Sequence, residues 1–79
     1  MARQKKPALI LSFARTTDAM AVEKFCMANE LPGRLIPVPR EITAGCGLAW
    51  KAAPEDEEAL TSALTKAGLA WSGLYRLEL

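Results

Sequence analysis

Ala8-Leu9-Ile10-Leu11-Ser12-Phe13-Ala14 is a short, mostly apolar run bounded by polar residues. Its length favours a buried strand, because helices in globular domains usually need ten or more residues. Residues 15–18 then supply helix-start chemistry, since a threonine can cap backbone N–H groups and Asp18 suits the positive end of a helix dipole. Apolar residues recur at helical spacing from Ala19 to about Asn29, and Pro32 follows that helix in a turn. The start of the chain therefore predicts a strand followed by a helix.

Three more strands and a second helix are predicted after this helix. Arg34–Val38 forms the second strand, and Pro37 places it at a sheet edge because proline has no N–H for a ladder. Leu48–Ala52 is the third strand. The second helix starts at Pro54, which suits a first helical position, and residues 75–79 alternate as the last strand. The apolar stripe of the second helix consists of Leu60, Ala63, Leu64 and Ala67.

This order of elements predicts an α+β fold, a ferredoxin-like βαββαβ sandwich. Its four-stranded antiparallel sheet would carry both helices on one face. We expect a single domain over residues 8–79, preceded by a flexible basic tail over residues 1–7. The aromatic residues Trp50, Trp71 and Tyr75 are expected in the core.

Composition excludes several functional classes. The sequence has 79 residues, and a domain of this size buries only roughly 60% of the surface that its unfolded chain exposes. Such a small domain is not expected to enclose a deep active-site cavity, which favours a carrier, binder or subunit over a self-contained enzyme. The net charge is +1, and no basic stripe is interleaved with aromatics, so no nucleic-acid partner is expected. No apolar run approaches the roughly 20 residues of a membrane span. With no signal-peptide pattern and only two cysteines, a cytoplasmic location and no membrane partner are expected.

Histidine is absent from the sequence. This absence excludes the Cys-His and Ser-His arrangements that activate nucleophiles in many enzymes. It also leaves too few ligands for a conventional zinc site within one chain. We therefore expect no metal.

Cys46 lies in the polar loop Pro39-Arg40-Glu41-Ile42-Thr43-Ala44-Gly45-Cys46-Gly47. In the expected fold this loop shares one end of the sheet with Arg15, Thr16 and the start of the first helix. A helix N-terminus and nearby arginines stabilise a thiolate. Arg15 and Arg40 are the candidates for that role, so this end of the molecule is the candidate site.

Two interpretations of Cys46 follow from its neighbours. Gly45 and Gly47 remove side-chain cover and let another molecule approach the sulfur. The same glycines also suit a tight turn in which Cys46 packs as a small apolar residue. Cys26 lies on the apolar stripe of the first helix, which predicts core packing. Its place more than two turns from the loop argues against a disulfide with Cys46.

The residues around the loop carry a recognisable pattern. Leu35-Ile36-Pro37-Val38-Pro39-Arg40-Glu41-Ile42 is followed closely by Cys46-Gly47-Leu48-Ala49. Further matching segments are Val22-Glu23-Lys24, Pro54-Glu55-Asp56 and Gly73-Leu74-Tyr75. From Ala8 to Tyr75 the chain resembles the selenium/sulfur (Se/S) carrier protein-like family of short bacterial domains. Gly45 stands where that family often has another small residue, and the Cys-Pro-x-Pro motif of established sulfur-relay carriers is absent.

The resemblance implies a carrier that holds sulfur or selenium on Cys46 as a persulfide or perselenide. Its partners would be donor and acceptor proteins of sulfur or selenium transfer, and catalysis would belong to them. Arg40 and Arg15 would stabilise the anionic carried form, and amides around Gly47 would add hydrogen bonds. No cofactor is implied apart from the carried atom.

Two other functions are compatible with the sequence. The chain would serve as a non-catalytic interaction or regulatory module if it dimerised through its sheet and Cys46 were structural. Alternatively, Arg15, Arg40 and the helix N-terminus would bind an anion or nucleotide. No glycine-rich phosphate loop supports the latter.

Overall fold

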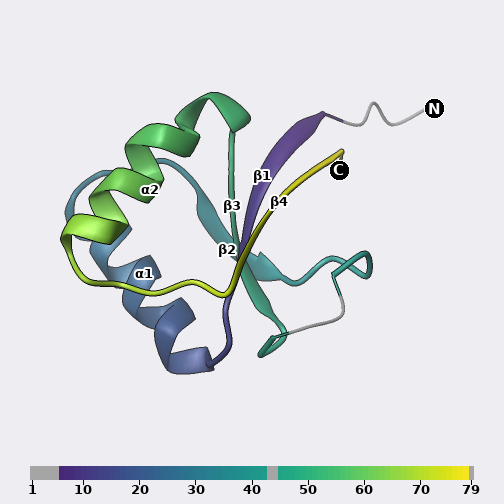
Figure 1. Cartoon of the computed structure of the whole chain (residues 1–79), viewed down its shortest axis with the longest axis horizontal. Coiled ribbons are helices and arrows are strands. Elements are labelled where there is room, and N and C mark those ends of the chain that lie inside the picture. The colour runs from purple at the N-terminus through teal and green to yellow at the C-terminus, as the bar shows by residue number, and fades with distance from the viewer. Residues whose placement is uncertain (1–5, 43–44, 79) are drawn as a thin grey trace.

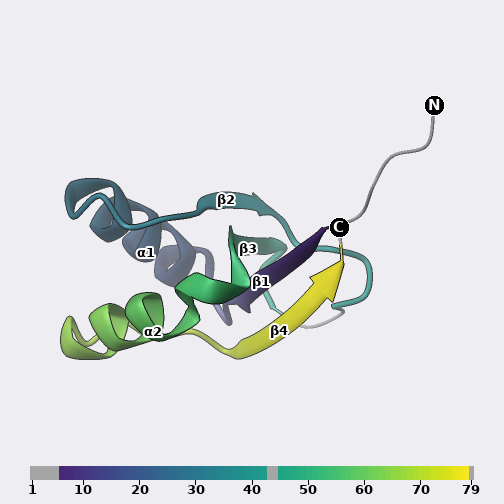
Figure 2. The same cartoon turned by 90° about the horizontal axis from the view of Figure 1, so that it is seen from above.

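The computed structural model describes residues 6–42 and 45–78 (Figure 1). Its sheet is antiparallel and four-stranded, in the order β2-β3-β1-β4. The elements are β1 (Pro7–Ser12), α1 (Thr16–Ala28), β2 (Arg34–Pro37), β3 (Leu48–Ala52), the 3-10 turn η1 (Pro54–Asp56), α2 (Glu57–Lys66) and β4 (Gly73–Glu78). Both helices lie on the same side of the sheet (Figure 2). The predicted α+β class is confirmed.

Most sequence-predicted elements are found within a few residues of their expected bounds. β3 has the predicted bounds, and β2 lies at the sheet edge that Pro37 requires. β1 begins at Pro7, inside the predicted tail. The rest of that tail, residues 1–5, lies outside the described residues, as does Leu79 in the last predicted strand.

The main core lies between the sheet and the helices. β1 contributes Leu9 and Leu11 to this core, and α2 contributes Leu60 and Leu64, all without exposed surface. Trp50 of β3 is the largest fully buried side chain in this cluster. Leu60 and Leu64 of the stripe predicted for α2 therefore face the sheet, as their spacing requires. Ala63 is half-buried, whereas Ala67 is exposed because it lies just after the helix ends, so its predicted place in the stripe is wrong.

A second apolar cluster lies on the helix-free face of the sheet. Ala8 and Ile10 of β1 meet Ala49 of β3 there, because successive side chains of a strand point to opposite faces. Ile42, from the loop between β2 and β3, packs onto these residues and is only 4% exposed. That loop lies on the side of the sheet away from the helices (Figures 1 and 2). β1 is thus buried on both faces, which explains its nearly continuous apolar run.

The aromatic residues divide between the two faces. Trp50 is buried as predicted, and Trp71 is half-buried against the helix-side core. Tyr75 is exposed, at 36%, so its predicted core position is wrong. Leu74 of β4 packs on the helix side, whereas Leu77 packs in the second cluster. The alternation in β4 predicts the period of a strand, but it does not indicate which of its two faces the helices cover.

Helix α1 begins one position earlier than a threonine cap requires. Its N-cap is Arg15, which makes no side-chain capping hydrogen bond, so the expectation that a threonine caps the helix is wrong. Thr16 already belongs to the helix, and an arginine side chain has no acceptor to offer backbone N–H groups. Asp18 does lie in the first turn, as predicted, where its charge suits the dipole.

The end of α1 places a non-glycine residue in the left-handed region. The Leu31 N–H donates to the Cys26 carbonyl at 2.8 Å, and the Glu30 N–H donates to the Met27 carbonyl at 3.5 Å. These bonds form a Schellman motif, in which glycine is the usual residue at the left-handed position. Glu30 occupies that position with φ 53°. An L-residue pays a steric cost of about 1–2 kcal/mol there.

We expect Glu30→Gly to stabilise the protein by about 0.5–1 kcal/mol, because relief of the left-handed strain exceeds the extra chain entropy of glycine. Urea denaturation followed by circular dichroism measures this change. Glu30→Ala is the control, since it removes the same carboxylate but keeps the Cβ. If the alanine variant gained as much stability as the glycine variant, charge and not backbone strain would be the cause.

Candidate functional site

The loop between β2 and β3 is fixed at three points by backbone hydrogen bonds. At its base, the Val38 N–H donates to the Gly47 carbonyl at 3.0 Å. Within it, the Ile42 N–H donates to the Pro39 carbonyl at 2.9 Å. Thr43 and Ala44 lie outside the described residues. The buried Ile42 side chain adds an apolar anchor to the sheet.

The third bond ties the cysteine to the segment that precedes α1. The Cys46 N–H donates to the carbonyl of Phe13 at 3.0 Å, and Phe13 is fully buried in the helix-side core. The structure therefore brings Cys46 to the end of the sheet from which α1 starts. The expected juxtaposition of this loop with that segment is present.

The two glycines beside Cys46 have different structural reasons. Gly45 has φ 109°, and a Cβ at this position would lie 2.6 Å from the Phe13 carbonyl oxygen. Gly47 has φ 89°, but a Cβ there would meet nothing within 4 Å. Gly45 thus allows the close approach that the Cys46 bond requires, whereas Gly47 only adopts a backbone angle that L-residues avoid. Both glycines are exposed.

The Cys46 side chain is half-buried. Its sulfur packs at the margin of the helix-side core, and the thiol lies 4.0 Å from the Leu48 carbonyl oxygen as a weak donor. The backbone on each side of it is exposed. Cys46 is therefore held in a defined position and still borders solvent, which is the arrangement that a thiol transferring a group between proteins requires.

The predicted basic neighbours of Cys46 are exposed. Arg15 has a side chain that is 80% exposed, with its Nε 3.8 Å from the Asp18 carboxylate. Arg40 and Thr16 are exposed as well. Among the described residues, neither arginine forms a hydrogen bond with the Cys46 thiol. The structure thus places Arg15 and Thr16 at the end of the molecule where Cys46 lies, without joining them to the sulfur.

Cys26 differs from Cys46 in its burial. It lies on α1 with no exposed surface, within the helix-side core, as predicted. Burial raises the pKa of the Cys26 thiol, because desolvation disfavours the thiolate. Both cysteines are free thiols. Cys26 therefore serves as an internal reference for a buried, unreactive thiol.

The raised pKa of Cys26 predicts a loss of stability in alkaline solution. The unfolded chain ionises this thiol near the ordinary value of about 8.5, while the folded protein keeps it protonated to higher pH. The stability that the neutral Cys26 thiol contributes is thus fully present below that ordinary value, and it is lost as the pH rises through the pKa of the folded state. We expect the urea midpoint to decline less steeply above this pH in Cys26→Ala than in the wild type. Cys46→Ala is the matched control, and equal slopes in the wild type and Cys26→Ala would contradict the assignment.

Sequence reasoning missed the structural role of Ile42. Ile42 is an isolated aliphatic residue in a loop without hydrophobic periodicity, so nothing in the sequence pattern indicates that it packs on the sheet. In the part of the chain that the structure describes, no cluster of three or more metal-ligating side chains occurs. None of the described helices has the length and apolar character that crossing a membrane requires.

The model of the family described as "Putative Se/S carrier protein-like" matches residues 8–76, which include both cysteines and the whole loop. Searches of curated proteins and of solved structures gave no match. Because the matched segment covers most of the sequence, the chain belongs to the Se/S carrier protein-like family.

Proposed function

We propose that this protein carries sulfur or selenium as a persulfide or perselenide on Cys46, between a donor protein and an acceptor protein. The observation that carries the proposal is the family match over residues 8–76. The contrast between the two thiols supports the choice of residue, because Cys26 is sealed in the core and Cys46 borders solvent.

The transfer itself needs no cofactor. The Cys46 thiolate attacks the terminal sulfur of a donor persulfide, forming a new S–S bond as the bond within the donor breaks. The donor cysteine leaves as a thiolate, which takes up the electron pair of the broken bond, so no net oxidation occurs. An acceptor thiolate then attacks the terminal sulfur on Cys46 in the same way, and Cys46 leaves as a thiolate. Selenium follows the same scheme.

Arg15 and Arg40 would stabilise the negative charge of the carried atom. Both side chains are exposed, and Arg15 lies close in the chain to Phe13, which holds the Cys46 amide. A persulfide extends the side chain outward by one atom and carries a negative charge on its terminal sulfur. Thr16 lies at the exposed N-terminus of α1, where backbone N–H groups favour an anion. Gly45 and Gly47 would leave room for a partner's cysteine.

Alkylation of the folded protein tests whether Cys46 is accessible. With a small alkylating reagent and peptide mass analysis, we expect Cys46 to be modified in native buffer and Cys26 only in denaturant. Cys26→Ala should leave the labelling rate unchanged, and Cys46→Ser should abolish native labelling. Labelling of Cys46 that required denaturant would remove the basis of the proposal.

We also infer that the fold is ferredoxin-like and that the protein acts in the cytoplasm. The antiparallel order β2-β3-β1-β4, with β1 and β3 in the centre and both helices on one face, supports the fold assignment. Two cysteines that are free thiols support a reducing compartment.

A second candidate function rests on the helix-free face. Tyr75 is exposed there, and Ile36 and Leu77 are only half-buried. This surface suits a regulatory or interaction module that dimerises through its sheet, with Cys46 in a structural role. Light scattering on the wild type and on Tyr75→Lys distinguishes the two functions. A dimer that is lost in Tyr75→Lys but persists in Cys46→Ser, together with an unreactive thiol, would favour the interaction module.

A further inference from the structure

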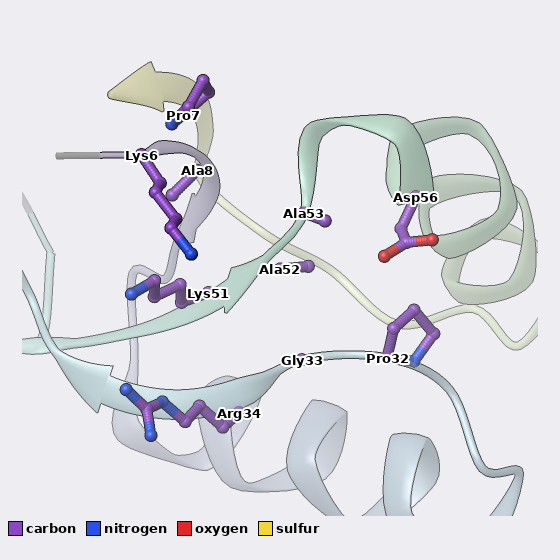
Figure 3. Close-up of a pocket in the computed structure, with 10 residues that line it drawn as sticks. All are labelled: Lys6, Pro7, Ala8, Pro32, Gly33, Arg34, Lys51, Ala52, Ala53 and Asp56. Atoms are coloured by element: carbon purple, nitrogen blue, oxygen red, sulfur yellow. The ribbon is translucent and has the colours of Figure 1, made fainter. Parts of the chain in front are cut away.

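A pocket of about 450 Å³ lies at the opposite end of the sheet from Cys46. Its walls are the start of β1, the turn before β2, the end of β3 and the turn η1. The volume falls within the range of about 300–1,000 Å³ found for small-molecule sites. Figure 3 shows the ten residues that line it.

Three cationic side chains line one side of this pocket. Lys6 precedes β1, while Arg34 of β2 and Lys51 of β3 are directly opposite each other in the register of the two strands. The amino groups of the lysines and the guanidinium group lie on the same side of the pocket, and the carboxylate of Asp56 lies on the other side (Figure 3). Within the described residues, none of the three cations forms an ion pair.

This arrangement opposes stability unless an anion is present. Like charges directly opposite on neighbouring strands repel each other, and Lys6 adds a third positive charge to the same hollow. Elsewhere in the described part of the chain, arginine side chains do form ion pairs, as Arg76 does with Glu57 and Arg15 with Asp18. The repelling pair is therefore a feature that a ligand would relieve, since a bound dianion interacts favourably with all three cations.

The remaining lining residues of the pocket indicate which kind of chemical group is attached to the anion. Between the cations and Asp56 the lining is apolar and small, with Pro32 and Ala52 as representative residues. The position of Pro32 in the pocket wall is fixed, because the Trp50 indole N–H donates a hydrogen bond to the Pro32 carbonyl at 3.1 Å. Asp56 can accept a hydrogen bond from a hydroxyl or amino group. The space exceeds what a bare oxyanion needs.

We propose that this pocket binds a small organic phosphomonoester, with its phosphate on Lys6, Arg34 and Lys51 and its organic part toward Asp56. This site is independent of Cys46 and of the carrier role. It also differs in position from any anion site at the start of α1, because Arg34 and Lys51 lie at the other end of their strands.

Inorganic phosphate and phenyl phosphate are suitable probes for titration followed by amide NMR. We expect shifts at Gly33, Ala52 and Ala53, and several-fold tighter binding of phenyl phosphate, because its ring covers apolar surface. Potassium chloride at matched ionic strength should not reproduce the shifts, since it only screens the repulsion. Shifts that chloride reproduces, shifts confined to the Cys46 loop, or equal affinity for the two probes would overturn the proposal.

Two variants separate binding from folding. Arg34→Gln and Lys51→Gln should each weaken phenyl phosphate binding about tenfold, as expected for the loss of one charged hydrogen-bond donor. Neither should lower the thermal midpoint measured without ligand, because each removes a repulsion. Lys24→Gln, on an exposed position of α1 outside the pocket, is the control and should bind like the wild type. Unchanged affinity in both pocket variants would contradict the site.

Discussion

Gly45→Ala should lower the free energy of unfolding by about 2–4 kcal/mol, because backbone strain and a steric conflict with the Phe13 backbone add. Strain at a positive φ costs about 1–3 kcal/mol for an L-residue. A Cβ at Gly45 would also lie 2.6 Å from the Phe13 carbonyl oxygen, so the loop must move away from Phe13. That movement breaks the 3.0 Å bond from the Cys46 amide.

Gly47→Ala is the matched control for this effect. Its φ is also positive, but its Cβ would enter open space, so only the strain at the positive φ is expected, and the loss of stability should be smaller than in Gly45→Ala. Urea denaturation measures both variants, and alkylation of Cys46 reports on the loop. We expect faster labelling of Cys46 in Gly45→Ala only. Equal losses of stability in the two variants would show that contact with Phe13 does not hold the loop.

Trp50→Ala should cost about 3–5 kcal/mol, as is usual when a large aromatic side chain is removed from a core. Trp50 is 2% exposed, and its indole N–H donates to the Pro32 carbonyl at 3.1 Å. A chain of this size has a total stability of about 4–12 kcal/mol at typical values per residue. The alanine variant should therefore be largely unfolded at moderate urea concentrations, as measured by circular dichroism.

Trp50→Phe keeps this prediction testable if the alanine variant does not fold. It retains most of the apolar surface but loses the hydrogen bond to Pro32, and we expect a cost of about 1–3 kcal/mol. Trp71→Phe is the control, because Trp71 is half-buried at the margin of the same core. A smaller loss in Trp50→Phe than in Trp71→Phe would contradict the central position of Trp50.

Elements with a strong local pattern were predictable from the sequence. The run at Ala8–Phe13 is too short for a helix and too apolar for a loop, and all of it except Phe13 lies in β1, one of the two central strands. Leu60 and Leu64 recur at helical spacing and are fully buried. The position of Cys46 beside the segment leading into α1 followed from the order of the elements alone, because two parallel strands separated by a helix end on the same side.

Features that depend on register or on distant contacts were not predictable. The period of β4 does not tell which face the helices cover, so the sequence predicts a core position for Tyr75, although this residue is exposed. The pairing of Arg34 with Lys51 is fixed by the register of β2 on β3. The sequence of neither strand specifies that register on its own. Ile42 is buried only because its loop folds back over the sheet.

Sulfur loading followed by intact-mass measurement tests the carrier role most directly. The wild type, Cys26→Ala and Cys46→Ser are each incubated with a low-molecular-weight persulfide donor and freed of excess reagent. The intact mass of each protein is then measured. We predict that the wild type and Cys26→Ala gain one sulfur atom, which a thiol reductant removes, and that Cys46→Ser gains none. A gain that persists in Cys46→Ser, or no gain in the wild type, would contradict the assignment of Cys46 as the carrying residue.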